Sequence, residues 1–241
     1  MRYKMIVCYD GTFFHGFQRQ KSYISVQEVL EQKLVEIMQT PIVIHGAGRT
    51  DAGVHAIGQV VHFDSNQLVP VENLRKILNK KLYPHIMVKH IELVDETFHA
   101  RKSAIKKEYR YFVSIESFNP LKANYQLFFH DRIQIGKIRE AMTYIIGTHD
   151  FKSFSKNEAS ASTRRTIELF ELNIDNNILE FRIIGNGFLY HMVRIIIALM
   201  LKVAEGKLQP EDIKRILDGK ERRLAPYVAP AQGLYLWNVY Y

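Results

Sequence analysis

Residues 46–56 of this 241-residue chain read GAGRTDAGVHA, and they place a single carboxylate, Asp51, among glycines. Glycine permits tight turns, positive φ angles and close approach of a ligand. A glycine-rich phosphate loop opens a helix whose N-terminus faces the phosphates. Residues 57–63 instead have the composition of a β-strand. The stretch therefore predicts a corner between two strands that presents Asp51 in a fixed direction.

Composition limits the class of protein. The net charge is +8 and the pI is near 9.4, which favours a polyanionic partner such as nucleic acid, although a basic surface without function stays open. The one cysteine, Cys8, rules out an internal disulfide and fits a reducing cytoplasm. The longest apolar run, 195–201, is far shorter than the ~18 residues of a membrane span. We expect a soluble cytoplasmic protein without a membrane segment.

Hydrophobic periodicity predicts the elements of the first half of the chain. Ser25 and Glu28 form a capping-box pattern at the start of a helix that ends before Pro41. The predicted helices cover 26–38 and 71–78, and the predicted strands cover 3–9, 42–44, 57–63, 87–94 and 108–114. In the last strand, alternation places Tyr109 and Tyr111 on one face.

The second half repeats a mixture of helices and strands. Its predicted helices cover 138–146, 188–204 and 210–217, and its predicted strands cover 166–174, 178–184 and 233–241. The segment 118–131 contains Pro120 and has no clear periodicity, so we place a crossover there and predict two domains, 1–117 and 118–241. This order predicts an α+β fold with helices on a mainly antiparallel sheet.

Arg194 is the most informative residue outside the glycine-rich stretch, because it interrupts the otherwise apolar run 192–201. A helix that is apolar all round is usually buried, and an unpaired buried charge costs roughly 3–5 kcal/mol. Asp51 is the candidate partner, and the pairing would keep its carboxylate ionised, as a nucleophile requires. Two simpler readings stay open on this chemistry: Arg194 snorkels to the surface, and Asp51 caps a turn.

Several motifs resemble one enzyme family. Residues 48–55, GRTDAGVH, match the signature of the TruA family of tRNA pseudouridine synthases, and 188–194, FLYHMVR, resemble its arginine motif. The segments 109–111 (YRY), 98–101 (FHAR) and 233–236 (GLYL) are similar to further family motifs. The resemblance extends over essentially the whole chain and is lowest in 153–165.

The resemblance implies a function and a site. It implies the pseudouridine-synthase α+β fold, with two similar halves forming an extended sheet and an active-site cleft between them. It implies isomerisation of uridine to pseudouridine in the tRNA anticodon stem-loop, at positions 38–40, without cofactor or metal, by a homodimer. Asp51 would be the nucleophile, Arg194 its partner, Tyr109 and Leu189 the walls of the uracil pocket, and Arg49 the residue that replaces the flipped nucleotide.

Other chemistry has weaker support. His45, His55 and His62 lack the spacing of common zinc motifs, and Ser153 and Ser155 lack a nucleophile motif. The cationic residues expected to contact RNA are Arg19, Arg101, Lys106, Arg164 and Arg165. Two alternatives stay open: a pseudouridine synthase acting on other tRNA or ribosomal RNA uridines, and a noncatalytic RNA-binding protein.

Overall fold

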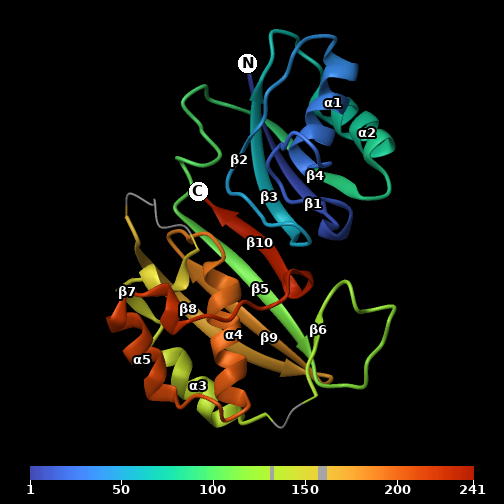
Figure 1. Cartoon of the computed structure of the whole chain (residues 1–241). Helices are drawn as coiled ribbons and strands as arrows, with labels where there is room; N and C mark the ends of the chain where they lie inside the picture. Colours follow the sequence, from blue (N-terminus) through green and yellow to red (C-terminus); the bar gives the residue numbers. More distant parts are fainter. Residues whose placement is uncertain (131–132, 157–161) are drawn as a thin grey trace. The chain divides into compact units, whose positions relative to one another are not determined.

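The structure, a computed structural model, describes residues 1–130, 133–156 and 162–241 and contains two compact units (Figure 1). Met1–Ile105 and Tyr235–Tyr241 form the N-terminal unit, and Lys106–Leu234 form the C-terminal unit. These units divide the chain at 105/106 rather than at 117/118. The reason is that strand β5 (Lys106–Ser114) pairs along its length with β9 (Ile178–Gly185).

The N-terminal unit contains a mainly antiparallel sheet with the strand order β4-β1-β3-β10 (Figure 1). Strand β1 pairs antiparallel with β3 and β4, whereas β10 runs parallel to β3. The short β2 pairs antiparallel with β3, opposite Val61 and His62. The elements are β1 (Arg2–Tyr9), 3₁₀ helix η1 (Gly11–Phe13), α1 (Val26–Met38), β2 (His45–Gly46), β3 (His55–Asp64), α2 (Val71–Leu82), β4 (Ile86–Val94) and β10 (Leu234–Tyr240).

Helices α1 and α2 cover one face of this sheet (Figure 1). Alternate residues of β1 are buried, among them Tyr3 and Met5, as the period of two demands. Ser25 caps α1 by accepting the Glu28 N–H at 3.3 Å, which confirms the predicted start of this helix.

The strand predicted at 42–44 is wrong. Helix α1 supplies the hydrogen bonds that a neighbouring strand would have made: the buried Glu31 carboxylate accepts the Ile44 N–H at 3.0 Å, and Gln27 donates to the Ile44 carbonyl at 3.2 Å. Two polar side chains of a helix therefore satisfy this extended segment, and pairing begins only at His45.

The C-terminal unit has the strand order β5-β9-β8-β7, with antiparallel neighbours and β6 parallel beside β5. Its remaining elements are β6 (Leu127–Phe128), α3 (Ile135–Thr143), β7 (Gly147–Asp150), η2 (Lys152–Phe154), β8 (Arg164–Asp175), α4 (Met192–Ala204), α5 (Pro210–Gly219), η3 (Arg222–Leu224) and η4 (Ala231–Gly233). The segment Ser153–Arg165 lies partly outside the described residues.

Helix α4 is the core of the C-terminal unit, and eleven of its thirteen residues are buried. It begins at Met192 rather than at Phe188, because His191 has a φ of +62° and residues 189–192 form a turn. On β5, Tyr109, Tyr111 and Val113 are buried as alternation predicts. The predicted α+β class with mainly antiparallel pairing is confirmed in both units.

Candidate active site

Asp51 lies in the loop between β2 and β3, so the predicted corner between two strands is confirmed. The Ala47 N–H donates to the Val60 carbonyl at 2.7 Å, and the Val54 N–H donates to the Asp51 carbonyl at 3.1 Å. Gly53 takes a φ of +78° within this turn. The backbone therefore holds Asp51 in place, with the residue half-buried.

A second segment holds the Asp51 loop from outside. We call residues 11–17, which are part of the connection from β1 to α1, the strap. The Phe17 N–H donates to the Thr50 carbonyl at 3.0 Å, and the Gly53 N–H donates to the Phe14 carbonyl at 3.4 Å. Gly16 has a φ of +90°, and a Cβ there would lie 2.7 Å from the Thr50 carbonyl oxygen. The strap approaches the loop as closely as only glycine allows.

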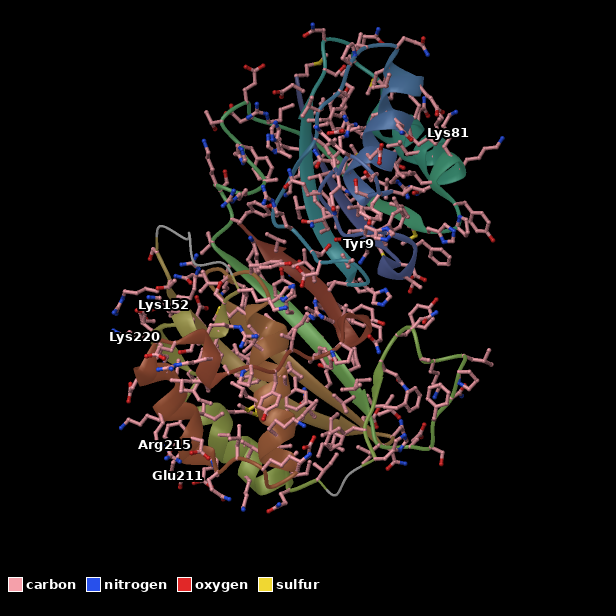
Figure 2. All side chains as sticks on the ribbon, in the orientation of Figure 1. Tyr9, Lys81, Lys152, Glu211, Arg215 and Lys220 are labelled. Carbon is pink, nitrogen blue, oxygen red and sulfur yellow. The ribbon has the colours of Figure 1, made fainter. Side chains whose placement is uncertain are left out.

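Side chains of the sheet fix the residues on either side of Arg49. The buried Thr50 hydroxyl lies 2.8 Å from the hydroxyl of Tyr9, which ends β1 (Figure 2). Gln59 donates to the Gly48 carbonyl at 2.8 Å. Burial raises the pKa of Tyr9 well above its usual range, so its hydroxyl stays neutral. Arg49 itself is exposed.

His55 connects the strap to the start of β3. Its Nδ1 accepts the Gly11 N–H at 3.0 Å, and its ring stacks on Tyr235 with the centroids 4.6 Å apart. The same Nδ1 lies 3.3 Å from an Asp10 carboxylate oxygen. Sequence reasoning considered His55 only as a metal ligand. Its position directly after the glycine-rich loop was the feature of the sequence that could have indicated this structural contact.

Arg194 is the third residue of α4 and is half-buried. Its Nε–H donates to the Ala229 carbonyl at 2.7 Å. The neighbouring Tyr111 hydroxyl donates to the Pro230 carbonyl at 2.9 Å. Burial raises the pKa of Tyr111 and the Arg194 cation opposes that rise. The segment around Ala229 therefore orients the guanidinium through a carbonyl, a partner that sequence reasoning missed.

Tyr109 contacts the segment 188–194, which also contains Leu189, through Phe188. Tyr109 is buried, and its ring packs edge-to-face on Phe188 with the centroids 5.0 Å apart. Leu189 is also buried, in the turn before α4. The predicted residues thus form two groups. Arg49 and Asp51 belong to the N-terminal unit, whereas Tyr109, Leu189 and Arg194 belong to the C-terminal unit.

The cations predicted to bind RNA differ in their surroundings. Arg19 pairs with the buried Glu31 at 2.5 Å, and Lys106 pairs with Glu168 at 3.0 Å. Arg101 and Arg164 are exposed.

Arg165 is half-buried and donates to the Ser162 carbonyl at 3.0 Å, and burial lowers its pKa. Lys152 and Lys220 lie in the C-terminal unit (Figure 2), and the Lys220 Nζ is 3.8 Å from the Asp150 carboxylate. Asp150 is the backbone neighbour of Arg164 in the β7–β8 ladder.

Three histidines of the N-terminal unit, His45, His62 and His99, lie together. His62 is buried and packs between His45 and His99, with ring centroids 5.0 and 4.6 Å away. Its Nδ1 accepts the Ala100 N–H at 3.1 Å. Burial, followed by His99 and His45, lowers the pKa of His62 to about 4.

Within residues 1–130, 133–156 and 162–241, no group of three or more His, Cys, Asp or Glu side chains is arranged to hold a metal ion. Ser153 donates to the Ile216 carbonyl at 2.7 Å and is buried. In the same described residues, no helix has the length and apolar character needed to cross a membrane.

Comparison with known proteins identifies the family of the chain. A family model described as tRNA pseudouridine synthase matches residues 5–101 and 141–241. Asp51 and Arg194 lie inside the matched ranges, and Tyr109 lies between them.

Proteins named tRNA pseudouridine synthase A are similar over the whole chain. Those of Exiguobacterium sp. and Bacillus subtilis are 43% and 44% identical, covering 100% of this chain and 98% and 99% of their own lengths. That of Limosilactobacillus reuteri is 44% identical, covering 100% of this chain and 96% of its own length. The chain therefore belongs to the tRNA pseudouridine synthase family of isomerases.

Proposed function

We propose that this protein converts uridine to pseudouridine in the anticodon stem-loop of tRNA, at positions 38–40, with Asp51 as the nucleophile. The reaction breaks the C1′–N1 bond, forms a C1′–C5 bond and exchanges the C5 hydrogen for one on N1. Substrate and product contain the same atoms and electrons, so the chemistry calls for no redox or group-transfer cofactor.

The observation that carries this proposal is the way in which the Asp51 loop is held. Residues 48, 50 and 53 are each bonded to a different part of the N-terminal unit, namely Gln59, Tyr9 and the strap. A nucleophile held by several independent contacts loses little orientational freedom when it attacks. The alternative, in which the Asp51 side chain caps a turn, is not needed to explain the turn, because the Asp51 backbone carbonyl already accepts the Val54 N–H.

Asp51 attacks either C1′ of the ribose or the uracil ring, and both routes place a covalent bond on its carboxylate. After glycosidic cleavage, the uracil turns so that C5 faces C1′. Tyr109 stacks on the uracil and assists proton removal, while Leu189 closes the apolar wall of the pocket. Both side chains are buried in the C-terminal unit, as a pocket that excludes water requires.

Arg194 is the cation that stabilises the Asp51 carboxylate during the reaction. The Ala229 carbonyl accepts the Arg194 Nε–H, and a guanidinium oriented in this way can bind a carboxylate through two parallel N–H groups. Arg49, exposed next to Asp51, takes the space of the flipped nucleotide.

The basic residues bind the phosphates of tRNA, and the protein acts in the cytoplasm as a homodimer. The net charge of +8 supports an anionic partner. If the protein is a homodimer, sedimentation should give twice the chain mass of 28.2 kDa.

The decisive experiment uses tRNA carrying 5-tritiated uridine. Asp51→Ala should abolish tritium release and leave the Kd for tRNA within about threefold of wild type. Asp95→Asn is the matched control, because Asp95 is an exposed aspartate that caps a turn by accepting the Thr97 N–H at 2.8 Å. Full activity in Asp51→Ala would contradict the mechanism. Mapping of modified positions outside 38–40 would instead favour a different target uridine.

A further inference from the structure

The strap has a second face that the Asp51 loop does not use. Its residues Phe14, Gly16 and Phe17 are buried, and they face the sheet and the Asp51 loop. Phe13, which precedes them, and His15, which lies between Phe14 and Gly16, are exposed, Phe13 by 51%. Packing explains the inward aromatics. It does not explain aromatic rings on the outer face beside the nucleophile.

Each outward ring is held in a fixed orientation by a stacked partner. Phe13 stacks on His85 with the centroids 3.6 Å apart and the planes 28° apart. His15 stacks on Tyr23 with the centroids 4.3 Å apart and the planes 27° apart. Tyr23 is 54% exposed. We call these four residues the exposed aromatic pairs.

Backbone hydrogen bonds fix both pairs to the same framework as Asp51. The His85 carbonyl accepts the Asp10 N–H at 3.0 Å, and the Ile24 carbonyl accepts the His15 N–H at 2.9 Å. The residue between Phe13 and His15, Phe14, accepts the Gly53 N–H. Rings anchored in this way lose little freedom when a flat ligand stacks on them.

Cations accompany the exposed aromatic pairs. Lys21 is exposed within the same connection, and Arg49 is exposed in the adjacent Asp51 loop. Flat aromatic surfaces combined with positive charge are the usual binding surface for single-stranded nucleic acid, where each base stacks and each phosphate meets a cation.

We propose that the exposed aromatic pairs stack on unpaired bases next to the target uridine, and so hold the RNA strand while that uridine enters the site. This inference rests on the proposed function, because it takes the ligand to be the RNA substrate. The pairs bind flanking nucleotides and take no part in bond breaking.

The test measures stacking directly. The probe is an anticodon stem-loop RNA that carries 2-aminopurine at a nucleotide flanking the target uridine, and the protein is the full chain with Asp51→Asn to prevent turnover. Binding should quench the 2-aminopurine fluorescence. Phe13→Ala and Tyr23→Ala should weaken binding about five- to 100-fold and remove the quench. Phe13→Trp and Tyr23→Phe should retain both the affinity and the quench, because they keep an aromatic face.

Leu93→Ala is the matched control. Leu93 is 47% exposed and lies at the opposite end of β4 from His85, since it pairs with Tyr3 at the start of β1. The Leu93→Ala variant should bind the RNA and quench the 2-aminopurine fluorescence as the parent protein does. Unchanged affinity in both alanine variants would overturn the proposal, and so would weaker binding with an unchanged quench, which indicates a structural effect.

Turnover separates this proposal from the proposed function. In the active protein, Phe13→Ala and Tyr23→Ala should raise KM for tRNA and change the single-turnover rate at saturating tRNA by less than about threefold. If the wild-type chain forms no pseudouridine in tRNA, the proposed function fails. If it does, and both variants keep the wild-type KM, only the stacking proposal fails.

Discussion

Arg194 and Ala229 exchange two hydrogen bonds across the C-terminal unit. The Arg194 Nε–H donates to the Ala229 carbonyl at 2.7 Å, and the Ala229 N–H donates to the Arg194 carbonyl at 3.0 Å. The first turn of α4 is thereby fixed to the segment before β10. A backbone carbonyl orients the guanidinium of Arg194. The role of Arg194 therefore depends on the planar shape of this group as well as on its charge.

Replacing Arg194 should separate these two properties. We expect Arg194→Leu to lower kcat at least about 100-fold and to lower the melting temperature by roughly 2–4 °C per kcal/mol of stability lost. Arg194→Lys keeps the charge but lacks the planar fork, so it should recover stability more than activity. Tritium release and thermal melts check this. Arg215→Leu, an exposed arginine of α5 paired with Asp212, is the control. A fully active Arg194→Leu variant would refute the assigned role.

Gly16 should be irreplaceable for geometric reasons. Alanine there would carry a φ of +90° and place its Cβ 2.7 Å from the Thr50 carbonyl, so the strap must move away from the Asp51 loop. We expect Gly16→Ala to cost about 1–3 kcal/mol of stability and to reduce kcat more than it raises KM. Gly136→Ala is the matched control, since no atom lies within 4 Å of the added Cβ in helix α3. It should be neutral or stabilise the protein. Equal behaviour of the two variants would contradict the close approach.

His62 should make the protein sensitive to acid. Its pKa is about 4 in the folded chain, below the ordinary histidine value of 6.5, because of burial and then the neighbouring His99 and His45. Between these two pH values the unfolded chain binds more protons than the folded one, so stability falls as pH falls from about 6.5 to about 4.

A histidine replacement tests this dependence. His62→Asn removes the titrating group, and an asparagine side-chain oxygen can still accept the Ala100 N–H. The drop in melting temperature between pH 7 and pH 5 should be smaller in His62→Asn than in wild type. His90→Asn, at an exposed position on β4, should leave that drop unchanged. An equally large drop in His62→Asn would exclude His62 as its source.

Salt dependence should distinguish RNA-binding cations from paired ones. We expect log Kd for tRNA to rise steeply with log salt. Arg164→Gln, at an exposed position, should reduce that slope by about one. Lys106→Gln should reduce it less, because Glu168 already pairs with Lys106 at 3.0 Å. Filter binding between low and moderate salt measures both slopes. Identical slopes in wild type and Arg164→Gln would exclude a phosphate contact at Arg164.

The sequence was sufficient for features with a local cause. A period of two places Tyr109 and Tyr111 on one face of β5, and Ser25 marks the start of α1. Such patterns depend on neighbours within a few residues, so a single chain carries them. The corner at Asp51 also has a local cause, because the glycines on either side of it permit a tight turn without help from distant residues.

Only the tertiary structure decided which atoms meet across long stretches of chain. It replaced the strand at 42–44 by contacts from Gln27 and Glu31, and it joined Arg194 to Ala229. It also separated the buried Phe14 from the exposed Phe13, two adjacent residues of the same type. Packing between distant segments determines these outcomes, and the hydrophobic pattern along the sequence does not predict that packing. The sequence by itself determined the nucleophile candidate and its loop, whereas the fold decided what holds that loop and which aromatic rings remain exposed beside it.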